Sequence, residues 1–195
     1  MSENFKPVPE NWNEVVDSET FKRTISRISY EIVEKKRDYE NLAIVGIRTG
    51  GEFIAKRIHK KISEIENTTE VAYGVIDITL YRDDLSHAAT QPTLKGTDLP
   101  FQISGARIVL VDDVLYTGRT IRAALDAVTD FGRPAVVELA AMVDRGHREL
   151  PIRPDYIGKN LPTSREQFVR VRLEEFGYKD GVYLIDSAHA VEGKK

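Results

Sequence analysis

The sequence predicts a single α/β domain, and three observations lead to this prediction. Three predominantly apolar segments, residues 42–47, 108–111 and 135–143, have the composition of strands that are buried on both faces. The first two are each followed by a turn that contains glycine, and then by apolar residues at helical spacing. The chain has 195 residues, 41% of them hydrophobic and 30% charged, which suits one globular domain with a sizeable core.

The overall composition excludes several classes of function. The chain contains no cysteine, so it can form no disulfide, thiolate zinc site or cysteine nucleophile. No apolar run approaches the length that spans a membrane, and the first residues, Met1-Ser2-Glu3-Asn4, are unlike a signal peptide. We therefore expect a cytoplasmic protein. The net charge of −3 gives no global attraction to nucleic acid, so an RNA-binding surface would have to be local.

The N-terminal part is predicted to contain an arm and a helix. Residues 1–17 contain two prolines and the only tryptophan, and we expect them to form an irregular arm. Apolar residues then follow at spacings of 4, 3 and 4, which predicts one buried face of a helix: Phe21, Ile25, Ile28 and Ile32.

A first anion site is predicted after the strand at 42–47. The turn Arg48-Thr49-Gly50-Gly51 leads into a helix with Ile54, Ile58 and Ile62 on one face. The first N–H groups of a helix have no partner within it and attract anions, and Arg48 is suited to a phosphate. Considered alone, an ordinary strand–helix turn explains this stretch equally well.

A strand and a long loop are predicted next. Residues 71–81 mix β-branched and aromatic side chains and predict a long strand. Residues 82–105 are polar, contain Pro92, Gly96 and Pro100, and show no periodicity. A loop of this length inside a compact domain is often a lid over a site, so we expect a lid here; a disordered insertion is the alternative.

The most informative stretch runs from Ile108 to Thr120. A buried strand leads to Asp112 and Asp113, and the small-residue turn Thr117-Gly118-Arg119-Thr120 opens a helix that stops at Gly132-Arg133-Pro134. The turn suits a phosphate, because it combines a helix start with hydroxyl donors. Two carboxylates beside a phosphate need a hydroxyl-rich group or a cation between them. A ribose 5-phosphate satisfies both requirements.

The C-terminal part contains short strands and a basic segment. Residues 168–173 and 182–185 predict short strands, and residues 187–195 a frayed tail. Between residues 145 and 172 there are seven basic residues against three acidic ones. This segment is a candidate nucleic-acid surface, although a solvated surface with salt bridges is the simpler explanation.

The stretch from Asp112 to Thr120 resembles the 5-phosphoribosyl 1-diphosphate (PRPP) binding motif of type I phosphoribosyltransferases. Together with Asp144 to Arg153, it is similar to one branch of that family, the PyrR regulators of pyrimidine operons, which are also uracil phosphoribosyltransferases. The resemblance runs from about Phe21 to Ile185. It implies the type I fold, with a central, mostly parallel sheet flanked by helices, a flexible lid loop and a small hood.

The resemblance also implies roles for individual residues. Asp112 and Asp113 are the expected catalytic pair, holding the ribose hydroxyls directly or through Mg²⁺, and Arg48, Thr49, Gly50 and Gly51 the diphosphate loop. Arg82 and Lys95 are expected in the lid, and Phe168 and Val169 beside the base. The expected ribose-phosphate site comprises Val109, Leu110, Val111, Val114, Leu115, Tyr116, Thr117, Gly118, Arg119 and Thr120.

The function implied is the formation of UMP and diphosphate from uracil and PRPP, in a homo-oligomer that is a dimer or tetramer. A second implied function is UMP-responsive binding of pyrimidine-operon leader RNA, through Arg27, His147, Arg148, Arg153 and Lys159. Two positions depart from the family pattern: Gly50 replaces a basic residue, and Tyr30 stands where a histidine is expected. The motif does not report the base, so orotate or a purine remains an alternative, as does an RNA-binding regulator with little catalysis.

Overall fold

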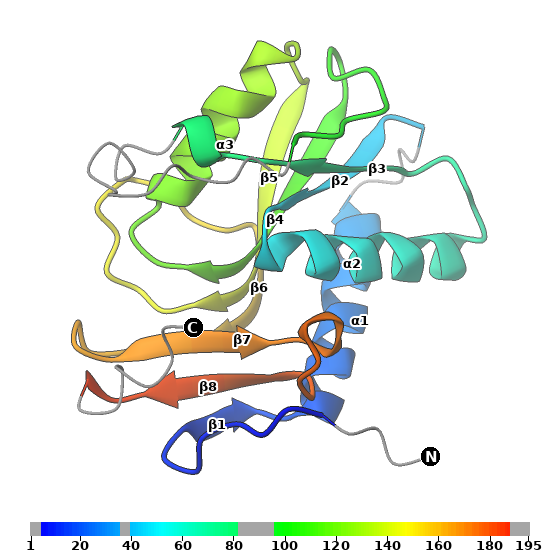
Figure 1. Ribbon diagram of the computed structural model, residues 1–195. Helices are drawn as coiled ribbons and strands as arrows, with labels where there is room; N and C mark the ends of the chain where they lie inside the picture. Colours follow the sequence, from blue (N-terminus) through cyan, green and yellow to red (C-terminus); the bar gives the residue numbers. More distant parts are fainter. Residues whose placement is uncertain (1–4, 36–39, 82–95, 188–195) are drawn as a thin grey trace.

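The computed structural model describes residues 5–35, 40–81 and 96–187, and these form an α/β domain with two sheets (Figure 1). The helices are α1 (Ser18–Lys35), α2 (Gly50–Glu66) and α3 (Arg119–Asp130), with short 3₁₀ turns η1 (Thr79–Tyr81) and η3 (Glu174–Phe176). The strands are β1 (Asn13–Val16), β2 (Leu42–Ile47), β3 (Ala72–Ile76), β4 (Arg107–Leu115), β5 (Val136–Asp144), β6 (Tyr156–Asn160), β7 (Phe168–Arg172) and β8 (Gly181–Ile185). The predicted fold class is confirmed.

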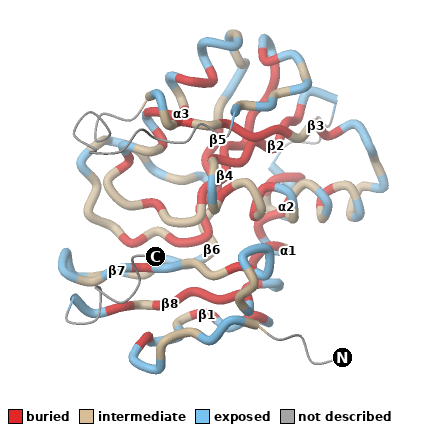
Figure 2. The backbone as a smooth tube through the Cα atoms, viewed as in Figure 1, coloured by how far each residue is buried: buried red, intermediate tan, exposed pale blue. Residues whose placement is uncertain are grey.

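The larger sheet is parallel throughout, in the order β3-β2-β4-β5-β6, and is covered on both faces. Alternate residues of β4 belong to two separate cores: Val109 and Val111 pack with α1 and α2, and Ile108 and Leu110 pack with α3. This explains the uninterrupted apolar composition of the strand, because both faces are buried (Figure 2). Helix α1 begins after Asp17, whose carboxylate accepts a hydrogen bond from the backbone N–H of Thr20 (2.7 Å).

The smaller antiparallel sheet, β1-β8-β7, forms the expected hood and lies below the larger sheet in Figure 1. It packs on the α1–α2 core through Val169, Leu173 and Val182. The prediction of an irregular arm over residues 1–17 is wrong for residues 13–16, which form β1. This strand is only four residues long and gains its order from pairing with β8, which is distant in sequence.

The predicted strand at 71–81 is shorter than expected, because the chain turns at Asp77. The Asp77 carboxylate accepts hydrogen bonds from the Thr79 N–H (2.9 Å) and the Gly96 N–H (3.2 Å), so it holds both sides of the following loop. Residues 82–95 lie outside the described residues. The predicted lid is wrong for the part from residue 97 onward, where Asp98 bridges to Val75 and Ile103 is buried in the α3 core.

A second strand, besides β1, was not predicted. Within the described residues, β6 pairs only with β5 and carries a polar end, so its sequence, Tyr-Ile-Gly-Lys-Asn, lacks the apolar run of the central strands. Of the predicted tail, residues 188–195 lie outside the described residues. None of the helices in the described ranges is long and apolar enough to cross a membrane.

Candidate active site

The acidic pair lies inside β4, at the point where one of its two neighbours stops. Pairing of β4 with β2 ends at Val111, whereas pairing with β5 continues to Leu115. Asp112 and Asp113 therefore stay in an extended strand that is anchored on one side and open on the other. This is the carboxyl edge of a parallel sheet, where ligands of such folds bind.

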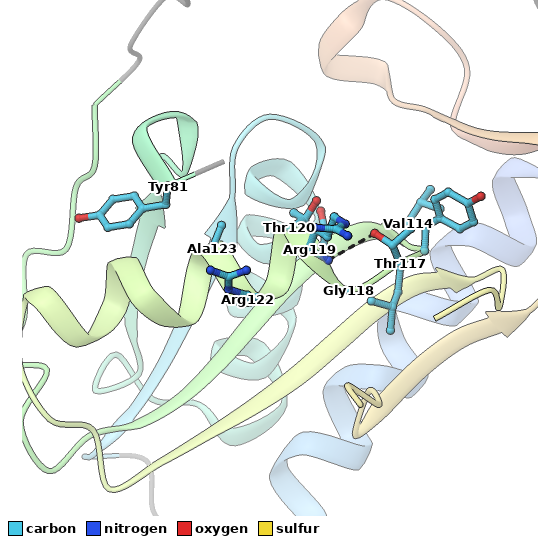
Figure 3. Close-up of a pocket in the computed structure, with 11 residues that line it drawn as sticks. Tyr81, Val114, Thr117, Gly118, Arg119, Thr120, Arg122 and Ala123 are labelled. Carbon is cyan, nitrogen blue, oxygen red and sulfur yellow. Dashed lines mark hydrogen bonds between the residues drawn. The ribbon is translucent and has the colours of Figure 1, made fainter. Parts of the chain in front are cut away.

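The small-residue turn follows directly and leads into α3. Gly118 adopts a φ of 95°, in the left-handed region that favours glycine, and gives α3 no side-chain cap. The first amides of α3 therefore point into the turn, and only the Arg119 N–H has a local acceptor, Thr117 Oγ1, at 3.4 Å (Figure 3). Such an arrangement of N–H groups is a ready anion site. The backbone N–H groups of Glu149 and Leu150 brace the turn by donating to Thr117 O at 2.9 and 3.2 Å.

A cavity of about 440 Å³ lies over this turn (Figure 3). It brings together one of the two aspartates and most of the expected ribose-phosphate residues. Its lining also includes three residues that the sequence analysis missed. The lining consists of Asp112, Val114, Leu115, Tyr116, Thr117, Gly118, Arg119 and Thr120, and of the unpredicted Tyr81, Arg122 and Ala123. Helical periodicity could have identified Ala123, which lies one turn after Thr120, but nothing local in the sequence points to Tyr81.

The other predicted anion site, the α2 turn formed by Arg48 to Gly51, packs against the same end of β4. A Cβ on Gly51 would collide with the backbone of Val111 and Asp112, and a Cβ on Gly50 would collide with the Asp113 carboxylate. Both positions therefore need glycine for close approach rather than for an unusual φ. The α2 turn therefore packs against Asp112 and Asp113, whereas the α3 turn, 69 residues further along the chain (117 − 48), shares the cavity with Asp112. The Arg48 guanidinium pairs with Glu52 at 3.1 Å, and its buried Nε has no hydrogen-bond partner among the residues that the structure describes.

Burial dominates the electrostatics of Asp113. It raises the pKa of the Asp113 carboxyl above its ordinary value, although hydrogen bonds from Val114 N and with Asp112, and the positive charge of Arg170 on β7, offset part of the shift. A carboxylate held under these conditions is stabilised by any cation or hydroxyl donor that approaches it. The site therefore favours a ligand with such groups next to its phosphate.

Several expected site residues lie elsewhere. The side chains of Val109, Leu110 and Val111 are completely buried in the two cores, which leaves only their backbone to face a ligand, and their assignment to the ribose-phosphate site stays a prediction. Val169 is likewise 7% exposed and packs in the core, which leaves only its backbone to face a base, whereas Phe168 is 40% exposed. Arg82 and Lys95 lie outside the described residues.

The candidate RNA-binding residues divide into two groups. Arg27 donates to the carbonyls of Ile157 and Gly158 (both 2.8 Å), and therefore ties α1 to β6. His147 donates from Nε2 to Thr163 O (2.6 Å) and Arg148 from NH1 to Tyr116 O (2.7 Å), so both have structural contacts. Arg153 and Lys159 are exposed and make no hydrogen bond or ion pair with another described residue.

Comparison with known proteins agrees with this geometry. Residues 11–175 match the family model of the phosphoribosyl transferase domain. The bifunctional protein PyrR of Elusimicrobium minutum is 54% identical over 171 residues, which cover 88% of this chain and 95% of that protein. PyrR of Deinococcus radiodurans is 53% identical over 172 residues, which cover 88% of this chain and 93% of that protein.

Solved structures resemble the chain in fold. A hypoxanthine-guanine phosphoribosyltransferase from Bacillus anthracis superposes with a TM-score of 0.67 at 16% identity, over 90% of this chain and 98% of that one. A Trypanosoma cruzi hypoxanthine phosphoribosyl transferase superposes with a TM-score of 0.71 at 16% identity, over 95% and 98% of the two chains. The fold, the matched domain and the identity to PyrR proteins lead to one conclusion: the chain belongs to the phosphoribosyltransferase family, in its PyrR branch.

Proposed function

We propose that the protein forms UMP and diphosphate from uracil and PRPP, and that it also binds RNA in response to UMP. The observation that carries the enzymatic proposal is the meeting of two anion-binding turns at one acidic strand end. PRPP has a phosphate at one end of its ribose, a diphosphate at the other and hydroxyls between them. The α3 turn, the α2 turn and the two aspartates offer complementary groups in the same order.

In this proposal the chain positions charge and supplies no nucleophile. N1 of uracil attacks the anomeric carbon as the bond to diphosphate breaks, and the N1 proton leaves. The amides and hydroxyls of residues 117–120 hold the 5-phosphate, and Arg48 with the start of α2 holds the departing diphosphate. The carboxylates orient the ribose hydroxyls. Enclosure of the cavity keeps water from competing with the base.

The donor set fits Mg²⁺. The ion prefers oxygen ligands, keeps several waters and binds proteins through one or two carboxylates together with substrate oxygens. Asp112 and Asp113 supply two such carboxylates, and no group of three or more metal-ligating side chains occurs among the residues that the structure describes. When bound, Mg²⁺ would neutralise charge on the diphosphate oxygens.

A screen of free bases tests the enzymatic proposal. Purified protein is mixed with PRPP, Mg²⁺ and uracil, orotate, hypoxanthine or guanine in turn, and the nucleotide product is identified. We expect UMP from uracil alone. Turnover of another base with none of uracil would contradict the assignment of the base. Turnover of no base would refute the enzymatic proposal and leave only the RNA-binding function.

Two exposed basic residues support the RNA-binding proposal. Arg153 and Lys159 flank the start of β6, and Arg27 holds that strand against α1, where Tyr30 is 49% exposed. Basic side chains bind RNA phosphates, and an exposed aromatic ring can stack on a splayed base. A leader RNA from pyrimidine genes should bind more tightly with UMP than without it. We also propose that the protein is cytoplasmic and homo-oligomeric.

A further inference from the structure

Arg145, the first residue after β5, is a buried cation without an acidic partner in the described part of the chain. Its side chain is only 6% exposed. The guanidinium donates to three uncharged oxygens: Thr163 Oγ1 (3.1 Å), Ser164 O (3.1 Å) and Gln167 O (2.8 Å). Burial lowers its pKa below the ordinary value for arginine. A charge kept in such surroundings is costly to the fold, so a role beyond packing has to be considered.

The second contact of Arg145 is with Tyr116, which precedes the proposed 5-phosphate turn at residues 117–120. The guanidinium carbon lies 4.0 Å from the centroid of the Tyr116 ring, which is a close cation–π contact. Tyr116 lines the cavity and immediately precedes the turn. The His147 ring lies against Tyr116 from the same segment, with centroids 6.1 Å apart and planes at 74°.

The loop that accepts these hydrogen bonds from Arg145 leads directly into β7. Residues 163–167 precede Phe168, and β7 is the strand expected to border the base. One planar side chain therefore joins Tyr116, at the start of the proposed 5-phosphate turn, to the loop before β7, the strand proposed to border the base. Lysine could not replace it, because only a guanidinium combines a flat face for stacking with a fork of donors for several oxygens.

We propose that Arg145 is a positioning residue that sets the distance between the 5-phosphate turn and the base-side strand β7. The proposal rests on the proposed function, and it assigns Arg145 no contact with the reacting atoms. It makes a specific demand: a ligand that spans both sides must depend on Arg145 more than a ligand that occupies the phosphate side alone. UMP has both a phosphate and a base, whereas PRPP has no base.

The test compares UMP and PRPP affinity, measured by calorimetry, in R145Q, R145K and R57Q. In R145Q and R145K the dissociation constant of UMP should rise about tenfold, and that of PRPP about twofold or less, since charged hydrogen bonds and a cation–π contact are lost. R57Q is the matched control: Arg57 binds Asp180 and Glu175 (both 2.6 Å), away from the cavity. It should lower the unfolding temperature and leave both affinities within about twofold of wild type.

A double-mutant cycle of R145Q with Y116L tests the path of the effect. If Arg145 acts through Tyr116, the losses of UMP affinity in the two single variants should not add in the double variant. Additive losses, equal weakening of UMP and PRPP, or unchanged UMP affinity in R145K would each overturn the proposal. If R145Q does not fold, the cycle uses R145K with the same criteria. If the wild-type protein binds UMP but converts no base, the proposed catalysis is refuted. The UMP affinities of the Arg145 variants would still test the positioning role of Arg145 in that case.

Discussion

At the scale of single residues, Asp113 sits where function and stability oppose each other. Its raised pKa means that folding favours the protonated carboxyl. The favourable contribution is complete below the unfolded value of about 3.9 and is lost as the pH rises through the higher folded value. As the pH rises from acid toward neutral, the Asp113 carboxyl therefore contributes less to the stability of the fold. A buried carboxylate that lowers stability at neutral pH is typical of a binding site in which a cation or hydroxyl group of the ligand stabilises the charge.

The variant D113N should separate these two effects. We expect turnover to fall by about a hundredfold or more, because one ribose and metal ligand is lost, and the unfolding temperature to be equal or higher at pH 7. The stability difference should vanish at a pH of about 2.5 or below, well under the unfolded value of about 3.9, where the wild-type carboxyl is protonated in both states. Assays and thermal melts across pH measure this. D98N, at an exposed position, is the control and should change neither property; full activity in D113N would refute the ribose role.

Gly50 and Gly51 offer a matched pair at the α2 turn. In G51A the new methyl group meets the backbone of β4, which cannot move alone, so the free energy of unfolding should fall by about 1–3 kcal/mol. In G50A it meets the Asp113 side chain instead, which can rotate. G50A should therefore lose activity with a smaller change in stability. Denaturant melts measure the free energy of unfolding of both variants, and assays measure their turnover. Equal destabilisation of G50A and G51A would contradict this account.

At the scale of elements, a buried polar network ties the starts of three strands to α1. Arg107 on β4, 2% exposed, binds Glu138 on β5 (2.8 Å), and Tyr156 on β6 donates to the same carboxylate (3.1 Å). Lys35, at the end of α1, adds a further ion pair with Glu138 at 2.8 Å. Burial alone would raise the pKa of Glu138, but the bonds from Lys35 and Arg107 lower it. This network lies at the opposite end of the sheet from the aspartates.

The variant E138Q should lower the free energy of unfolding by up to about 3–5 kcal/mol, because it removes the carboxylate charge that pairs with the buried Arg107 guanidinium. Since the folded pKa of Glu138 is lowered, its contribution is present above the unfolded value of about 4.3 and is lost as the pH falls through the folded value. Wild type and E138Q should therefore converge in stability at low pH. Urea titrations at pH 3 and pH 7 measure this. E31Q, which removes an exposed partner of Arg27, is the control and should have little effect.

The elements that the sequence predicted are those whose signal is local. Strand β2 and residues 108–111 of β4 are buried on both faces and are therefore apolar, and the periodicity of α1 follows from its one buried face. Two strands at sheet edges were missed: among the described residues β6 pairs on one side only, and β1 is defined by its pairing with β8. The Arg107–Glu138 pair could not be predicted either, because its members lie 31 residues apart.

At the scale of the whole molecule, the topology of the sheet assembles what the sequence shows as separate motifs. The two glycine turns were predicted singly; both adjoin the acidic end of β4 because β2 and β4 are neighbours, which no local pattern reports. The same holds for Arg145, which the sequence placed in a basic segment and the fold buries between the phosphate turn and the hood. Arg148, in the same segment, binds Tyr116 O and the Asp144 carboxylate (2.6 Å), so it too contacts the turn.

This arrangement predicts how UMP and RNA should affect each other. R153A and K159A remove exposed charges, so each should weaken leader RNA binding and flatten the slope of log affinity against log salt by about 0.7–0.9, with UMP affinity unchanged.

R148A should weaken UMP binding as well as RNA binding, because the substitution releases the turn at residues 117–120. Linkage then requires RNA to tighten UMP binding by the factor by which UMP tightens RNA binding, and R148A should reduce both factors equally. Calorimetry and filter binding measure the cycle, with an unrelated hairpin as control. If UMP does not raise affinity for the leader above that for the hairpin, the basic segment is a solvated surface and the protein acts only as an enzyme.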